Sequence, residues 1–213
     1  MIKKSYIEVD SQWGTLLKHQ YLQHTSSDSC LAVFFPGGDY PCDAPLLHYT
    51  RKASLLAGCD TLSLVYGYKV VNDEFSFDKV DDLVIDCCNV IDQIISKYDS
   101  VIFVGKSIGT VVAGKIIDRF ENKKISVFFM TPIPETINYI KKSKGEVVVG
   151  TNDKYFLPEN IEQVKQLPNI KTEIIPKATH SLEINNNYSE SLAILNKVTD
   201  LCDSLVREII NEN

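Results

Sequence analysis

The sequence has no long hydrophobic run and no run of basic residues. A helix that crosses a membrane needs roughly 20 consecutive apolar residues, and no stretch of the chain approaches that length. Lys and Arg together number 22 against 28 Asp and Glu, so the formal net charge is −6. No cluster of cations is present to face the phosphates of a nucleic acid. We therefore expect a protein that binds neither membrane nor nucleic acid.

The sequence also has no pair of cysteines in the C-x-x-C pattern, although six cysteines are present: Cys30, Cys42, Cys59, Cys87, Cys88 and Cys202. A zinc site needs four convergent ligands at characteristic spacings, so no metal is expected. We expect the six side chains to be reduced thiols that pack as small hydrophobic groups in a cytosolic protein. Lys3 and Lys4 are not followed by the apolar segment of a secretory signal, so a cytoplasmic location is predicted.

The composition is otherwise that of an average globular protein, with 44% hydrophobic and 23% charged residues. This excludes disordered chains, collagens and small disulfide scaffolds. The length of 213 residues fits one domain over residues 1–213. No oligomeric state is predicted.

Short β-rich segments alternate with helical segments along the chain. Residues 31–35 form a continuous apolar run, which is typical of a strand buried on both faces. Asp43 is the expected N-cap of a helix over 45–57, and Gly58 its end. The alternation predicts a mostly parallel sheet of about seven to eight strands with helices on both faces. The expected strands are 6–9, 13–23, 31–35, 61–66, 101–104, 125–130, 146–149 and 172–175. The other expected helices are 80–95, 107–120, 135–142, 158–166 and one that includes 198–209.

The expected strand 101–104 runs directly into Gly105-Lys106-Ser107-Ile108-Gly109, and a helix follows. This is the pattern G-x-S-x-G between a strand and a helix. The turn is so sharp that the serine needs small neighbours, and it lifts the hydroxyl clear of the sheet at a helix N-terminus. The pentapeptide is common by chance, and its position after a buried strand makes it far more specific. Ser107 is therefore the candidate nucleophile, and the Ile108 N–H a candidate oxyanion donor.

A phosphate-binding loop is the competing interpretation, because Gly105-Lys106-Ser107 resembles the end of G-x-x-x-x-G-K-S. That loop requires a glycine five residues before Gly105, where this chain has Ser100. The intervening residues also read as a strand and not as a flexible cradle. This interpretation is therefore set aside.

A serine hydroxyl is a weak nucleophile that needs a general base oriented by a third group. Asp153 follows the expected strand 146–149, and His180 follows the last expected strand. Their order after the serine is serine, acid, histidine, and the other histidines all precede Ser107. A surface-turn or capping role is the alternative for Asp153, with Glu183 as a weaker substitute acid. We expect Ser107, Asp153 and His180 to be the catalytic residues.

The second oxyanion donor is expected in the loop after strand 31–35, where Pro36-Gly37-Gly38-Asp39 stands. Glycines let the backbone approach a substrate oxygen closely. The N–H of Gly38 is the first choice and that of Asp39 the alternative, while a plain turn remains a third interpretation.

At this point the sequence resembles the α/β-hydrolase family, over nearly the whole chain. The matching residues are the elbow 105–109, Asp153, His180 and the glycine turn Gly37-Gly38. Within the family the chain looks like the small serine hydrolases without a cap. Many members have His-Gly where this chain has Pro36-Gly37, so the oxyanion loop can differ in shape. A cap, when present, follows the strand after the elbow helix, and only residues 131 to 145 are free there, too few for a lid.

The predicted function is hydrolysis of an ester or thioester of a small to medium acyl group through an acyl-enzyme, with a small-molecule substrate and no cofactor or metal. An open pocket is expected at the carboxyl ends of the strands. If the Asp39 carboxylate faces inward it disfavours anionic acyl groups, and equally it can cap the next turn. The predicted pocket residues are Asp39, Tyr40, Tyr68, Thr131, Pro132, Ile133, Phe156 and Leu182.

Two alternatives stay open on the sequence alone. An acyltransferase or a peptidase can use the same three residues with a different acceptor or substrate. A non-catalytic binding protein with a hydrolase fold is the other alternative, although such relatives usually lose one of the three residues.

Overall fold

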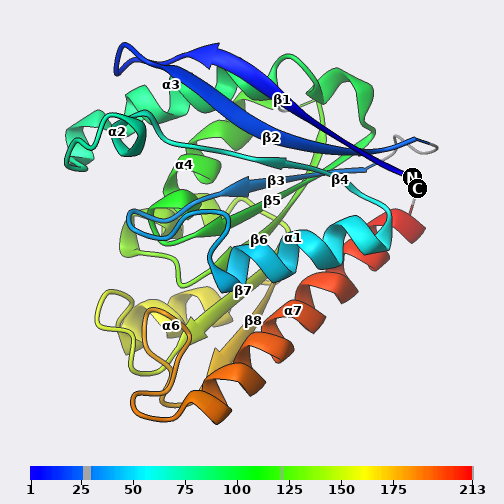
Figure 1. The fold of residues 1–213 in the computed structure, drawn as a ribbon. Helices are drawn as coiled ribbons and strands as arrows, with labels where there is room; N and C mark the ends of the chain where they lie inside the picture. The colour runs from blue at the N-terminus through cyan, green and yellow to red at the C-terminus, as the bar shows by residue number, and fades with distance from the viewer. Residues whose placement is uncertain (26–29, 121, 213) are drawn as a thin grey trace.

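A central sheet organises the computed structural model of the chain, which describes residues 1–25, 30–120 and 122–212 (Figure 1). Within these residues the sheet has eight strands in the order β1-β2-β4-β3-β5-β6-β7-β8. Strand β2 pairs antiparallel with β1 and β4, and the other neighbours pair parallel, which confirms the predicted sheet. The strands are β1 (Ile2–Asp10), β2 (Leu16–His24), β3 (Cys30–Phe35), β4 (Asp60–Ser63), β5 (Ser100–Lys106), β6 (Lys124–Met130), β7 (Gly145–Gly150) and β8 (Ile170–Ile175).

Helices cover both faces of the sheet (Figure 1). Two of them, α1 (Pro45–Ala57) and α7 (Tyr188–Asn211), pack together on one face, and the hydrophobic core beneath them is separate from the core on the other face. The helices of the other face are α3 (Val80–Ile91), α4 (Ile108–Ile117), α5 (Ile137–Ile140) and α6 (Pro158–Lys165). A further short helix, α2 (Gly67–Val70), follows β4.

Strand β3 shows why a continuous apolar run is needed at the centre of such a sheet. Leu31, Val33 and Phe35 pack into the core under α3 and α4. Ala32 and Phe34 point the other way, into the core under α1 and α7, because successive side chains of a strand alternate between faces. Both faces are covered, so every position must be apolar.

The start of α1 differs from the prediction. Its N-cap is Ala44, with no side-chain hydrogen bond, and Pro45 occupies the first helical position, where a missing N–H costs nothing. The carboxylate of Asp43 instead accepts a hydrogen bond from the Arg51 guanidinium at 2.9 Å. Gly58 ends the helix as predicted, with a φ of 112° that suits glycine.

Strand β2 also begins later than predicted. Residues 11 to 14 form a turn in which the Gly14 N–H donates to the Ser11 carbonyl at 2.9 Å, and Gly14 has a φ of 66°. Trp13 therefore lies in the turn and not in the strand. Its ring packs instead against Tyr68, with ring centroids 6.1 Å apart.

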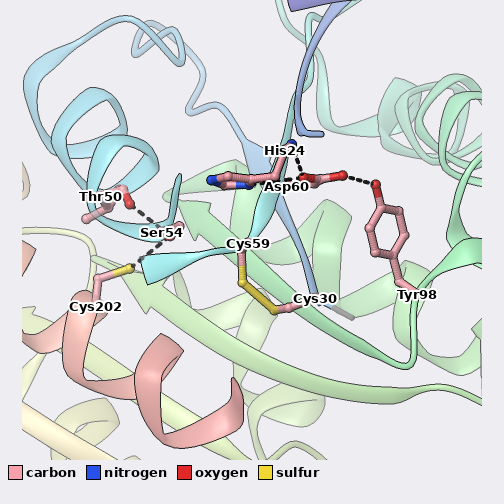
Figure 2. Close-up of a disulfide and its surroundings, with 8 residues drawn as sticks. All are labelled: His24, Cys30, Thr50, Ser54, Cys59, Asp60, Tyr98 and Cys202. Atoms are coloured by element: carbon pink, nitrogen blue, oxygen red, sulfur yellow. Dashed lines mark hydrogen bonds and ion pairs between the residues drawn. A yellow bond between two sulfur atoms is a disulfide. The ribbon is translucent and has the colours of Figure 1, made fainter. Parts of the chain in front are cut away.

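The prediction of six reduced cysteines was wrong for two of them. Cys30, at the start of β3, forms a disulfide with Cys59, directly before β4, and their Cα atoms are 4.8 Å apart (Figure 2). Cys42, Cys87, Cys88 and Cys202 are buried free thiols, as expected. Disulfides are rare in cytosolic proteins, so the cytoplasmic location stays a prediction that the thiols no longer support.

A buried carboxylate lies beside the disulfide (Figure 2). Asp60 accepts hydrogen bonds from the backbone N–H of His24 at 2.7 Å and from the hydroxyl of Tyr98 at 2.6 Å. These bonds join β2, β4 and the segment before β5 at the edge of the sheet where the parallel strands begin, which is the edge opposite the carboxyl ends.

The connection between β6 and β7 is short, as the sequence predicted. Residues 131–144 hold only a short turn of helix and α5, and Ile137 and Ile140 bury α5 against the core. No cap domain is present in this connection. None of the helices in the described ranges has the length and apolar character needed to cross a membrane.

Candidate active site

Ser107 lies at the sharp turn between β5 and α4. Its backbone has φ 53° and ψ −124°, a left-handed conformation that costs of order 1–3 kcal/mol for a residue other than glycine. The turn brings α4 against the backbone that follows β3. A Cβ at Gly109 would lie 2.4 Å from the Phe35 carbonyl oxygen and 2.5 Å from that of Pro36. Gly109 therefore permits the close approach that fixes the serine at the carboxyl edge of the sheet.

The structure brings Ser107, His180 and Asp153 into one hydrogen-bonded series. His180 Nε2 lies 2.8 Å from Ser107 Oγ, and His180 Nδ1 lies 2.7 Å from Asp153 Oδ2. A carboxylate only accepts hydrogen bonds, so Nδ1 carries the proton and the lone pair of Nε2 faces the serine hydroxyl. This is the protonation that a general base requires.

The surroundings hold the acid and the base in place. The Asp153 side chain is inaccessible to solvent, and its other oxygen accepts a hydrogen bond from the Tyr155 N–H at 2.9 Å. The Tyr155 ring packs edge-on against the His180 imidazole, with ring centroids 4.8 Å apart. His180 itself keeps 18% of its side chain exposed, so the imidazole is partly open to solvent.

The loop after β3 lies against Ser107. A Cβ on Gly37 would be 3.7 Å from the Cβ of Ser107. The Gly37 N–H donates to the Tyr40 carbonyl at 2.8 Å, which closes residues 37–40 into a tight turn. The turn presents the intervening backbone toward the serine.

The predicted oxyanion donors border the same space. Gly38 and Ile108 both line the cavity in front of Ser107. Among the described residues, no protein acceptor is bonded to either N–H, and the same holds for the N–H of Asp39. The Gly38 carbonyl accepts a hydrogen bond from the Tyr68 hydroxyl at 2.8 Å. That bond holds the peptide between Gly38 and Asp39, whose N–H is the alternative donor.

A cavity of about 640 Å³ opens at Ser107. Of the predicted pocket residues, Asp39, Tyr40 and Ile133 line it. The apolar residues that sequence analysis missed are Phe75, Phe77, Pro134, Tyr155 and Leu157. All five lie in the connections that follow β4, β6 and β7, with Phe77 and Pro134 at the starts of short 3-10 helices. The aromatic pair 75 and 77 was the available signal.

Five predicted pocket residues do not line this cavity. Tyr68, Thr131 and Phe156 are at most 1% exposed, because the chain turns them under the loops they belong to. Pro132 is buried as well. Leu182 is also buried and borders a different cavity, between the loop after β8 and α7.

The Asp39 carboxylate is exposed and forms an ion pair with Lys69. Lys69 therefore offsets the charge of Asp39 at the border of the cavity, which disfavours the idea that Asp39 repels anionic acyl groups. Within the ranges that the structure describes, no cluster of three or more His, Cys, Asp or Glu could hold a metal ion.

No protein-family model and no curated protein matches the sequence. Solved structures do match the fold. A serine hydrolase without a lid from Xanthomonas campestris is 14% identical, with a TM-score of 0.71 over 97% of this chain and 94% of that one. Dienelactone hydrolase from Anabaena variabilis is 18% identical, with a TM-score of 0.71 over 96% of each chain. An esterase from Pyrococcus furiosus is 14% identical, with a TM-score of 0.65 over 96% of this chain and 94% of that one.

These similarities extend over nearly the whole chain, and together with the sheet order they show that it has the α/β-hydrolase fold in its form without a cap. The resemblance seen in the sequence is confirmed at this level. At such low identity the fold is shared while the chemistry depends on the residues at the site.

Proposed function

We propose that the chain is a serine hydrolase that cleaves esters or thioesters of small to medium acyl groups. The observation that carries the proposal is the unbroken series Ser107 Oγ, His180, Asp153, with spacings of 2.8 and 2.7 Å, at the mouth of a cavity of about 640 Å³. Nucleophile, base and orienting acid are the groups that acyl transfer needs.

In the first half-reaction Ser107 Oγ attacks the carbonyl carbon while His180 Nε2 takes the hydroxyl proton. Asp153 stabilises the imidazolium that forms. The N–H groups of Ile108 and of Gly38, or Asp39 in its place, donate to the negative oxygen of the tetrahedral intermediate. The intermediate collapses when the bond to the leaving group breaks and His180 returns the proton to that group.

In the second half-reaction water attacks the acyl-serine, and His180 takes a proton from the water. Collapse of the second intermediate releases the acid and returns the proton to Ser107 Oγ. Partial exposure of His180 and the open cavity give water access, and this favours hydrolysis over transfer to another acceptor.

The cavity lining supports a neutral, apolar acyl group as substrate. Phe75, Phe77, Ile133 and Leu157 supply apolar surface near the serine, and burial of each methylene contributes about 0.8 kcal/mol. Small molecules therefore fit this site as partners.

A fluorophosphonate probe tests the proposal directly, because it reacts with an activated serine. We expect the native chain to be labelled and Ser107→Ala to remain unlabelled. His180→Gln should lose labelling as well, since glutamine cannot accept the serine proton. Equal labelling of the native chain and Ser107→Ala, or no labelling of either, would contradict the proposed function.

A further inference from the structure

Lys106 directly precedes the nucleophile, and its side chain is turned into the protein. Only 3% of the residue is exposed. A buried ammonium group is costly unless its donors are satisfied, and an apolar side chain of similar length would fit such a place at lower cost. In the part of the chain that the structure describes, Lys106 forms no ion pair with a carboxylate. The ammonium group must therefore be stabilised in another way.

Its contacts join three loops of the candidate site. Nζ donates to the backbone carbonyl of His180 at 3.0 Å and to Thr131 Oγ1 at 3.1 Å. It also lies 4.7 Å from the centroid of the Tyr40 ring, a favourable position for a cation. One side chain on β5 thus contacts the residues that follow β3, β6 and β8.

The bond to His180 is the informative one. It reaches the main chain of the same residue whose imidazole contacts Ser107 and Asp153. Hydrogen bonds from a charged donor are roughly twice as strong as neutral ones. Since Ser107 directly follows Lys106 at the end of β5, the bond links the main chain beside Ser107 to the main chain of His180.

We propose that Lys106 is a positioning residue. Its hydrogen bond connects the end of β5, directly before Ser107, to the main chain of His180, and so holds the imidazole in line with the serine hydroxyl. This inference rests on the proposed function. It adds a fourth residue to the three that the sequence order indicates, one that acts through the main chain of His180.

The test compares Lys106→Met with Lys123→Met. Lys123 Nζ also donates to a backbone carbonyl, that of Tyr98, at 2.6 Å, but near the opposite end of β5. Each substitution removes one bond between a lysine and the main chain. We expect kcat for a p-nitrophenyl ester to fall by tenfold or more in Lys106→Met, as about 1 Å of misplacement can cost 10²-fold, with KM little changed. Lys123→Met should keep the native kcat.

The split between kcat and KM separates positioning from simple packing. Loss of alignment between His180 and Ser107 lowers kcat and leaves KM little changed. A general loss of packing around the cavity would weaken substrate binding and raise KM as well.

Thr131→Val provides a second variant if Lys106→Met does not fold. The substitution removes the hydroxyl that accepts from the Lys106 ammonium group and nearly keeps the volume of the threonine side chain. We expect kcat to fall less than in Lys106→Met, with the same KM. Native kcat in both variants, or a fall in kcat that Lys123→Met shares, would overturn the role of Lys106. Absence of fluorophosphonate labelling in the native chain would instead overturn the proposed function, so the two failures are distinct.

Discussion

His19 is a buried base whose neighbours require it to be neutral. It lies in β2 and is inaccessible to solvent. Its Nδ1 accepts a hydrogen bond from the Val65 N–H at 3.1 Å, and no described residue bonds to its Nε2. Burial lowers the pKa of His19 from 6.5 to about 4. A proton on Nδ1 would displace the Val65 N–H and leave a charge in the core.

The free energy of unfolding should therefore fall as pH falls from 6.5 toward 4. In this range the unfolded chain binds a proton at His19 that the folded chain does not. From pH 7 to pH 5 the loss through this residue is about 2 kcal/mol. Urea unfolding of His19→Leu should show lower stability at pH 7, since Val65 loses its acceptor, but a smaller loss on acidification. Equal losses in the two proteins would refute the assignment.

At the scale of single residues, the sequence was enough to select the catalytic candidates but not most of the pocket residues. Ser107, Asp153 and His180 are marked by a rigid local motif and by their order after successive strands. Tyr68 and Phe156 follow strands too, yet they point beneath their loops. Which way a loop side chain points depends on packing between segments far apart in the sequence, and one sequence does not encode that in any local pattern.

The elements with strong periodicity or clear end signals were predicted well. The helix 45–57 agrees with α1, and the apolar runs at 31–35 and 101–104 lie within β3 and β5. Asp43 does not cap the helix, because its carboxylate is paired with the guanidinium of Arg51, eight residues further along the chain. Short α2 has too few residues for a periodic pattern and was missed.

The disulfide between Cys30 and Cys59 joins the starts of the neighbouring strands β3 and β4. The spacing of the cysteines along the sequence does not predict this pairing. The bond closes a sequence separation of 29, for which chain entropy predicts a stabilisation of about 3.6 kcal/mol. Dithiothreitol should therefore lower the urea midpoint of the native chain but not that of a Cys30→Ala, Cys59→Ala double variant. Cys42→Ala should keep the sensitivity to reduction.

Alkylation provides a check that does not depend on stability. The unfolded, unreduced chain should gain label at the four free cysteines, and at all six only after reduction. Six labels without reductant would show that the bond is absent.

For the molecule as a whole, the absence of a cap in the β6–β7 connection predicts how rate depends on substrate length. kcat/KM for p-nitrophenyl esters should rise about fourfold per added methylene while the chain is buried, and then level off. Longer chains extend from an open cavity into water and are not rejected. Phe77→Ala should flatten the rise, since Phe77 lines the mouth. A sharp loss of activity at one chain length would indicate a closed pocket instead.

The left-handed backbone at Ser107 has a consequence for how such a sequence persists. Glycine adopts φ 53° and ψ −124° without the steric cost that serine bears. Folding alone would therefore favour glycine at this position by about 1 kcal/mol. Selection for stability alone would not remove a mutation of Ser107 to glycine. Under the proposed function, the serine is held in this conformation for its reactivity, at a cost to the stability of the fold.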